Sequence, residues 1–227
     1  MPIIIGLLVI VILAVAPTLW VKAVLARHGK DRADFPGTGG ELARHLLDEL
    51  GLERFKVEET KAGDHYDPDL KTVRLLPEHF HGRSLTAVVI AAHEVGHAMQ
   101  DATGSRLLST RTRLARTAAI VERVGSIAML AAPLIAILLR HPAGFLLELG
   151  AGFAILSVGV VLHVASLPSE FDASFNRALP VLQQGGYIRP DDVPAARSIL
   201  RAAAFTYVAA ALMSLVNILR WLRILRI

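Results

Sequence analysis

Long uncharged apolar stretches alternate with polar stretches along the chain. The first covers residues 1–21 and contains no charged side chain. A helix rises about 1.5 Å per residue, so a stretch of this length spans a hydrocarbon core of about 30 Å. No Lys or Arg precedes it, which argues against a cleaved signal peptide and favours an uncleaved transmembrane anchor over 1–21.

Two further apolar stretches, 124–139 and 149–169, are joined by the short polar sequence Arg140-His141-Pro142-Ala143-Gly144. The first reaches spanning length if its helix begins near Thr117 and Arg123 extends toward the membrane surface. Together they predict a transmembrane hairpin over 117–166.

The last apolar stretch, 202–219, is followed by Arg220, Arg223 and Arg226. A fourth membrane helix with a basic tail over 202–227 is the favoured interpretation. The spacing of three between the arginines also fits an amphipathic helix lying at the membrane surface. Both alternatives stay open.

The hairpin would return the chain to the side it left, so the polar stretches 22–116 and 167–201 can form one domain. Lys and Arg residues are frequent next to the apolar stretches on this side, whereas Arg140 stands alone on the other. Cytoplasmic loops carry an excess of Lys and Arg, which predicts a multi-pass protein of the cell membrane with its polar domain in the cytoplasm. The arginines after a fourth span would lie outside, against this rule.

The polar stretch 22–116 contains several local signals. Thr38 and Glu41 form the Thr-x-x-Glu pattern of a helix capping box. The runs 55–60 and 71–76 alternate partly between polar and apolar residues, with the turn signal Asp67-Pro68-Asp69 between them, and predict a small β-hairpin. A helix over 85–101 follows, capped by Ser84 and ended by Gly104.

Composition adds two restrictions. The 227 residues include no cysteine, which excludes disulfides and thiolate metal sites, so any metal must be held by His and carboxylate groups. The formal net charge is +4, but Lys and Arg cluster beside apolar stretches rather than among aromatic residues. This pattern predicts a lipid bilayer as partner, and no nucleic acid.

The helix over 85–101 carries His93, Glu94 and His97 among apolar residues on all sides. Residues four apart project from the same face, so both imidazoles can hold one Zn²⁺ ion, and Glu94 can hold a water on it as general base. Gly96 leaves room for another backbone to approach. The alternative, a pair of core histidines bonded to carbonyl groups, is disfavoured because His-Glu-x-x-His arises by chance about 0.015 times in such a composition.

A catalytic zinc ion takes three protein ligands, and the third must be His, Glu or Asp here. The best candidate is Glu170, which would begin a new helix after Pro168. The alternative is that Ser169 caps this helix and that Glu170 and Asp172 only complement its dipole. From the residues alone, both remain open.

The sequences Ala91–Ala98, Asp64–Pro68 and Glu170–Ser174, with the anchor and the hairpin, resemble the YugP-like neutral zinc metallopeptidases of bacterial membranes over nearly the whole chain. They are more distantly similar to membrane gluzincin peptidases, which have a Glu-x-x-x-Asp helix. The resemblance implies a mainly α fold: multi-pass transmembrane helices with a membrane-apposed, zincin-like α+β catalytic domain that contains the small β-hairpin.

By this resemblance the zinc ligands are His93, His97 and Glu170, and Glu94 is the catalytic base. Ser174 stands where the gluzincin helix has Asp. The group that orients a ligating imidazole is therefore open among Ser174, Asp172 and Asp101.

An oxyanion stabiliser is also expected, and His65 or Tyr66 can supply it from the predicted hairpin. The alternative is that Asp64–Pro68 is an ordinary turn-forming cluster.

The sequence thus predicts a membrane-embedded zinc endopeptidase for membrane-associated peptide or protein substrates, with membrane protein partners or homo-oligomers possible. A catalytically silent zinc-binding scaffold is the alternative, and it would use four protein ligands. A metal transporter is disfavoured because ionisable groups inside the apolar stretches are few: Glu148 and His163. An ATP-dependent protease is excluded, because the chain has no phosphate-binding Gly-x-x-x-x-Gly-Lys-Ser/Thr loop.

Overall fold

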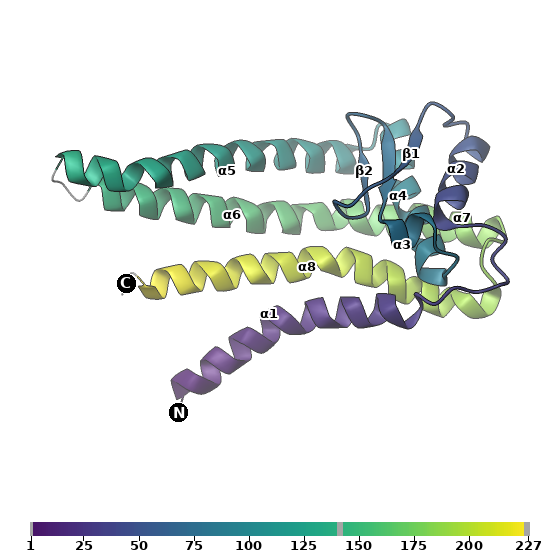
Figure 1. Ribbon diagram of the computed structural model, residues 1–227, viewed down its shortest axis with the longest axis horizontal. Coiled ribbons are helices and arrows are strands. Elements are labelled where there is room, and N and C mark those ends of the chain that lie inside the picture. Colours follow the sequence, from purple (N-terminus) through teal and green to yellow (C-terminus); the bar gives the residue numbers. More distant parts are fainter. Residues whose placement is uncertain (1, 140–142, 225–227) are drawn as a thin grey trace. The chain divides into compact units, whose positions relative to one another are not determined.

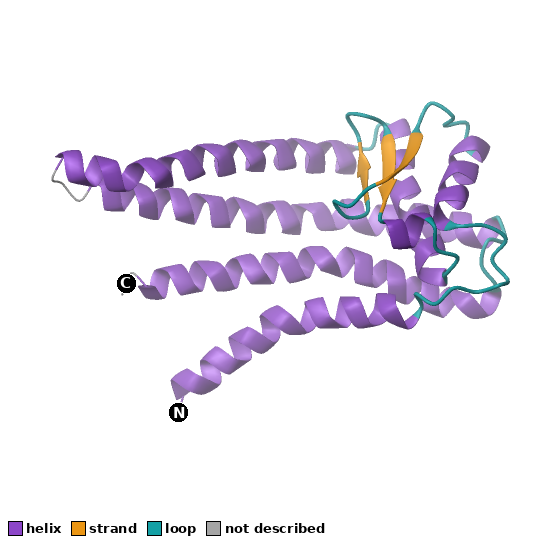
Figure 2. Cartoon of the chain, in the orientation of Figure 1, coloured by secondary structure: helices purple, strands orange, loops and turns teal. Residues whose placement is uncertain are grey.

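The computed structural model of the chain describes residues 2–139 and 143–224. It divides into two compact units. Unit 1 consists of Met1–Pro17, Thr110–Ser166 and Tyr207–Ile227, and unit 2 of Thr18–Ser109 and Leu167–Thr206. Figure 1 follows the chain through its elements, and Figure 2 shows that helices form most of it.

Long helices make up the described part of unit 1. They are α1 (Pro2–Arg27), α5 (Arg106–Leu139), α6 (Ala143–Phe171) and α8 (Val193–Ile224), and each continues into residues of unit 2. Many large apolar side chains on these helices are exposed within unit 1, among them Ile120, Leu130 and Leu138. Such surfaces are unusual on proteins surrounded by water.

Two helical segments in the described part of the chain, Leu149–Gln184 and Pro190–Ser214, are long and apolar enough to cross a membrane by length and composition. The predicted anchor over 1–21 lies in α1, although Met1 and the side chains of residues 2–14 lie outside the described residues. Residues 140–142 of the predicted turn and 225–227 of the basic tail also lie outside them. The number of membrane spans stays a prediction.

The sheet in the described residues has three strands, β1 (Lys56–Glu59), β2 (His65–Asp67) and β3 (Thr72–Leu75), in the order β1-β3-β2 (Figure 2). The prediction that the first and last of these form a hairpin is wrong, because β1 pairs with β3 in parallel, Lys56 facing Thr72. The antiparallel partner of β3 is β2. A parallel pair needs a connection that returns the chain to the starting edge, and the residues between β1 and β3 do this and supply β2 as well.

The predicted turn is present between β2 and β3. The Asp67 carboxylate accepts hydrogen bonds from the backbone N–H groups of Asp69 and Leu70, each at 3.0 Å. Asp67 also pairs with Arg74 at 2.7 Å. The turn is therefore where the sequence predicts it, and the error concerns which strand precedes it: β2, not β1, pairs with β3 across the turn.

Short helices surround the sheet in unit 2. Helix α2 (Gly39–Glu49) begins with the predicted capping box of Thr38 and Glu41, and α4 (Leu85–Ala102) is capped by Ser84 as predicted. The remaining elements are α3 (Pro77–Phe80), the π-helix η1 (Asp172–Ala178), α7 (Leu179–Gln184) and the 3₁₀ turn η2 (Pro190–Asp192). These helices, the sheet and the first part of α8 bury a core that includes Phe55, Leu47, Val73, Leu182 and Ile199.

The prediction that a new helix begins at Glu170 is wrong. Helix α6 continues through Pro168 to Phe171, and the π-helix η1 begins directly after it. Proline removes one backbone N–H, which a helix tolerates where neighbours satisfy the freed groups. Ser169 is consequently not a helix cap, and Glu170 lies inside a continuous helical segment. A separate contact joins this segment to α4, because the Gln100 side-chain amide donates to the Ser169 carbonyl at 2.9 Å.

Candidate metal centre

Helix α4 is buried along nearly its whole length, as its all-round apolar pattern predicts. The polar groups of the motif are buried with it: the exposed fractions are 3% for His93, 6% for Glu94 and 2% for His97. Burying such groups is costly unless they have partners. The arrangement around them therefore has to supply those partners.

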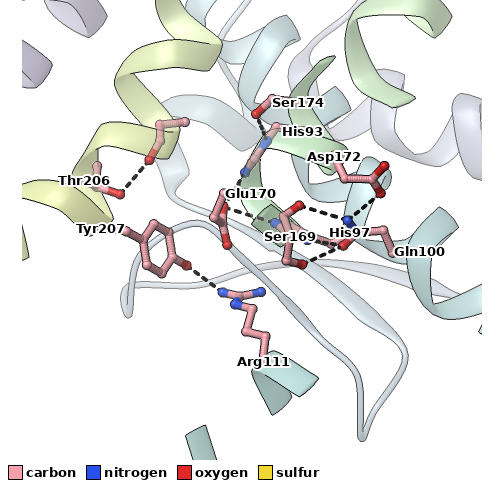
Figure 3. A network of polar contacts seen from close by, with 11 residues as sticks. His93, His97, Gln100, Arg111, Ser169, Glu170, Asp172, Ser174, Thr206 and Tyr207 are labelled. Atoms are coloured by element: carbon pink, nitrogen blue, oxygen red, sulfur yellow. Dashed lines mark hydrogen bonds and ion pairs between the residues drawn. The ribbon is translucent and has the colours of Figure 1, made fainter. Parts of the chain in front are cut away.

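Glu170 lies against the two imidazoles (Figure 3). Its Oε2 atom is 3.3 Å from Nε2 of His93 and 3.3 Å from Nε2 of His97. One ligand atom from each residue lies within 4.8 Å of the others. The two histidines are one helical turn apart on α4, whereas Glu170 comes 73 residues after His97. The structure thus brings together side chains that are distant in the sequence.

The donor set fits zinc. Two ligand atoms that each lie about 2.0–2.1 Å from a tetrahedral ion are about 3.3–3.4 Å apart. The two nitrogen–oxygen distances match this separation. Two imidazole nitrogens and one carboxylate oxygen are also the ligands of known catalytic zinc sites, which keep a fourth position open.

A close approach between α4 and η1 makes this geometry possible. A Cβ atom at Gly96 would lie 2.6 Å from the carbonyl oxygen of Ala173. Only glycine avoids this clash, so the expectation that Gly96 admits another backbone is confirmed. The close approach brings Glu170 and Ser174 against the histidine face of α4.

Both imidazoles are held from behind by polar side chains. Ser174 Oγ lies 3.1 Å from Nδ1 of His93, and Gln100 Oε1 lies 2.9 Å from Nδ1 of His97 (Figure 3). Hydrogen bonds at Nδ1 leave Nε2 of each ring facing Glu170. Of the candidates for this role, Ser174 contacts one of the candidate ligands, His93, directly.

The other two candidates do not contact the rings through the hydrogen bonds described. Asp172 accepts a hydrogen bond from Gln100 Nε2 at 2.8 Å and reaches His97 through that amide. Asp101 instead accepts from the Tyr66 hydroxyl and pairs with Lys71. Sequence reasoning missed Gln100, although its position three residues after His97, on the same helix face, was a usable signal.

Glu94 is buried beside the two imidazoles. Burial raises the pKa of the Glu94 carboxyl, and the neighbouring histidines partly oppose this shift. A raised pKa suits a group that takes up a proton near neutral pH and gives it back.

The predicted oxyanion residues lie on β2. Tyr66 is buried, stacks on Phe55, and donates a hydrogen bond to Asp101 at 2.5 Å. His65 Nδ1 lies 2.8 Å from the Gly63 carbonyl oxygen. These contacts do not test a role in binding an oxyanion, which stays a prediction.

The amino-acid sequence is similar to a known protein family and to one of its relatives over nearly the whole chain. The family model described as "Putative neutral zinc metallopeptidase" matches residues 3–226. The chain belongs to this family. It is also 35% identical to "Putative membrane protease YugP" of Bacillus subtilis (strain 168) over 206 residues, covering 90% of this chain and 88% of that protein. No solved structure matches the chain at a significant level. The resemblance stated from the motifs is thereby confirmed.

Proposed function

We propose that the protein is a membrane-embedded zinc endopeptidase that cleaves membrane or membrane-proximal proteins. The observation that carries this proposal is the joint approach of His93, His97 and Glu170 at distances that suit one zinc ion. The family of the chain supports a zinc peptidase, and its Bacillus subtilis relative supports a protease in a membrane.

In this proposal His93, His97 and Glu170 hold Zn²⁺, and a fourth position is open. When bound, zinc supplies Lewis acidity: it lowers the pKa of a water molecule and polarises a peptide carbonyl. Glu94 takes the proton from the attacking water and delivers it to the leaving amine. The buried position of Glu94 keeps this proton transfer away from bulk water.

Residues around the site position the three proposed zinc ligands. Ser174 and Gln100 hold the imidazoles, and Gly96 allows the segment that carries Glu170 to approach. We place the catalytic domain in the stretches 22–116 and 167–201, on the cytoplasmic side, with membrane helices over 1–21, 117–166 and 202–227. His65 or Tyr66 would stabilise the oxyanion in this scheme.

The proposal is tested first by the conservative variant Glu94→Gln in the full chain, purified in detergent. If Glu94 is the base, the variant binds zinc with unchanged stoichiometry and loses peptidase activity on a membrane-protein substrate by at least about 10²-fold. Removal of zinc by a chelator abolishes the wild-type activity, and zinc restores it. His65→Ala provides a separate measure of oxyanion stabilisation.

The competing function is a catalytically silent zinc-binding scaffold. Hydrolysis that is equal in wild type and Glu94→Gln would be a contaminant's activity and would support the scaffold. A fourth protein ligand in a zinc-bound structure would do the same, because closed sites with four protein ligands are structural.

A further inference from the structure

The side-chain amide of Gln100 is completely buried, and every hydrogen-bonding position of it is used. Its oxygen faces His97 Nδ1 at 2.9 Å and Ser169 Oγ at 3.1 Å. Its nitrogen faces the Ser169 carbonyl oxygen at 2.9 Å and an Asp172 carboxylate oxygen at 2.8 Å. A primary amide offers two donors and two acceptor lone pairs, so all four are satisfied.

The chemistry of the neighbours determines which way the amide points. A backbone carbonyl accepts hydrogen bonds and never donates them. Asp172 is likewise an acceptor, because Arg177 Nε and Asn176 Nδ2 each lie 2.9 Å from its carboxylate. Rotating the amide by 180° would place its oxygen against two acceptors. The amide nitrogen must therefore face Ser169 and Asp172.

The orientation of the amide in turn determines the tautomer of His97. With the amide oxygen facing the ring, Nδ1 of His97 must carry the proton and donate it. Nε2, 3.3 Å from Glu170 Oε2, is then the ring nitrogen that can give its lone pair to a metal ion held jointly with Glu170. Asp172 thus determines the orientation of the Gln100 amide, and this orientation determines which nitrogen of His97 is left to bind a metal.

His93 differs in this respect. Its Nδ1 faces a serine hydroxyl, which can donate as well as accept. Ser174 orients the His93 ring but does not by itself decide where the proton lies.

We propose that Gln100 is a positioning residue that holds the Nδ1–H tautomer of His97, with Asp172 and the Ser169 carbonyl holding the amide in its orientation. This inference rests on the zinc site of the proposed function. It does not rest on hydrolysis, because it concerns the affinity for zinc and the state of the imidazole before zinc binds.

The first experiment measures zinc affinity of the full chain in detergent micelles by competition with a chromophoric chelator. Gln100→Leu removes the acceptor for His97, and we expect zinc binding to weaken by about 10–100-fold, the range for partners of metal ligands. Asp172→Asn keeps a side-chain oxygen that can accept from Gln100, so its loss should be under about threefold. Gln184→Leu, an exposed glutamine on α7, is the matched control and should bind zinc like the wild type.

The second experiment requires no variant that could fail to fold. Histidine labelled with ¹⁵N reports the protonated ring nitrogen by long-range proton–nitrogen correlation in the zinc-free protein, at a pH of about 8.5, which is about two units above the pKa of a free imidazole. The His97 signal is assigned by its loss in His97→Gln. We expect the Nδ1–H form in the wild type, and a mixture with the Nε2–H form in Gln100→Leu.

An Nε2–H His97 in the zinc-free wild type would overturn the inference, and so would unchanged zinc affinity in a folded Gln100→Leu protein. The expected tautomer and affinity changes in a protein that hydrolyses no peptide would support the inference and defeat the proposed function. Hydrolysis with unchanged affinity in Gln100→Leu would do the reverse.

Discussion

Apolar side chains have opposite positions in the two units. In unit 2 they face inward: Leu47 on α2 and Val73 on β3 are fully buried. Among the described residues of unit 1 many large ones face outward: Leu130 on α5 is 82% exposed, and Leu138 is almost as exposed. Burial of apolar side chains is favourable in water, so the exposed apolar surface of unit 1 is what the proposed membrane location requires, and the core of unit 2 is typical of a protein in water.

The two units are also compared by the polar side chains that unit 2 buries. Unit 2 buries His93, His97 and Gln100, each of which has hydrogen-bonded or metal-binding partners. Burying a polar group without hydrogen-bond partners destabilises the folded state, so buried polar groups need complete hydrogen bonds. Unit 2 is thus organised around its buried polar site, and the exposed apolar surface of unit 1 suits a hydrocarbon environment.

The largest expected effect is on the free energy of unfolding, which should respond to a buried leucine and not to an exposed one. Leu47→Ala leaves a cavity in the core of unit 2 and should lower the free energy of unfolding by about 2–5 kcal/mol. Leu130→Ala, its exposed counterpart, should change it by less than about 0.5 kcal/mol. Thermal unfolding in detergent measures both. Equal losses would mean that Leu130 is covered in the folded protein and would end the comparison.

A charge on the outer surface of unit 1 tests the nature of its solvent. Leu130→Lys should disfavour insertion into a bilayer by about 2.5–3.5 kcal/mol, the cost of a lysine at the centre of a membrane helix. Carbonate extraction of membranes from expressing cells measures the inserted fraction. Glu53→Lys, an exposed substitution in unit 2, should leave that fraction unchanged. Undiminished insertion of Leu130→Lys would place this surface in water.

Gly96 in unit 2 and Gly150 in unit 1 differ in how closely other atoms approach them. Gly96→Ala adds a methyl group 2.6 Å from the Ala173 carbonyl oxygen, and should destabilise unit 2 by about 1–3 kcal/mol and weaken zinc binding. Gly150→Ala on α6 meets nothing within 4 Å and should stabilise its helix by about 0.5–1 kcal/mol. Thermal unfolding and zinc titration provide the readouts. A neutral Gly96→Ala would show that α4 and η1 do not approach closely.

The smallest effect concerns a buried ion pair of unit 2. Burial lowers the pKa of His79, but the Asp64 carboxylate 2.8 Å from Nδ1 outweighs it, so the pKa of His79 is raised. A raised folded-state pKa stabilises the protein below the unfolded value of about 6.5, and this contribution disappears as the pH rises through the folded-state pKa.

Asp64→Asn keeps an oxygen for the Leu76 N–H and removes the charge. Melting temperatures measured with a chelator from pH 6 to 9 should therefore fall less steeply with pH for this variant than for the wild type. A slope identical to that of the wild type would show that the pair contributes nothing.

Local features of unit 2 were predictable because short-range physics determines them. The helix expected over 85–101 is observed as Leu85–Ala102, and the cap at Ser84 and the capping box at Thr38 are present. The two imidazoles share a face because residues four apart always do in a helix.

Features that depend on contacts between distant residues were mistaken or missed. The parallel pairing of β1 with β3 depends on the path of the intervening chain, which the strand pattern does not encode. The continuation of α6 through Pro168 to Phe171 also differs from local propensity, which favours a break at a proline.

By itself, the sequence determined the types of candidate metal-binding side chain, their spacing on α4, the absence of thiolate ligands, and the apolar stretches. Only the tertiary structure decided that Glu170 meets both imidazoles, that Gln100 supports His97, and that Ser174 supports His93. The reason is that a helix determines the relative positions of residues within a few turns. The distance between two helices depends on side chains at their crossing, here on the missing side chain of Gly96.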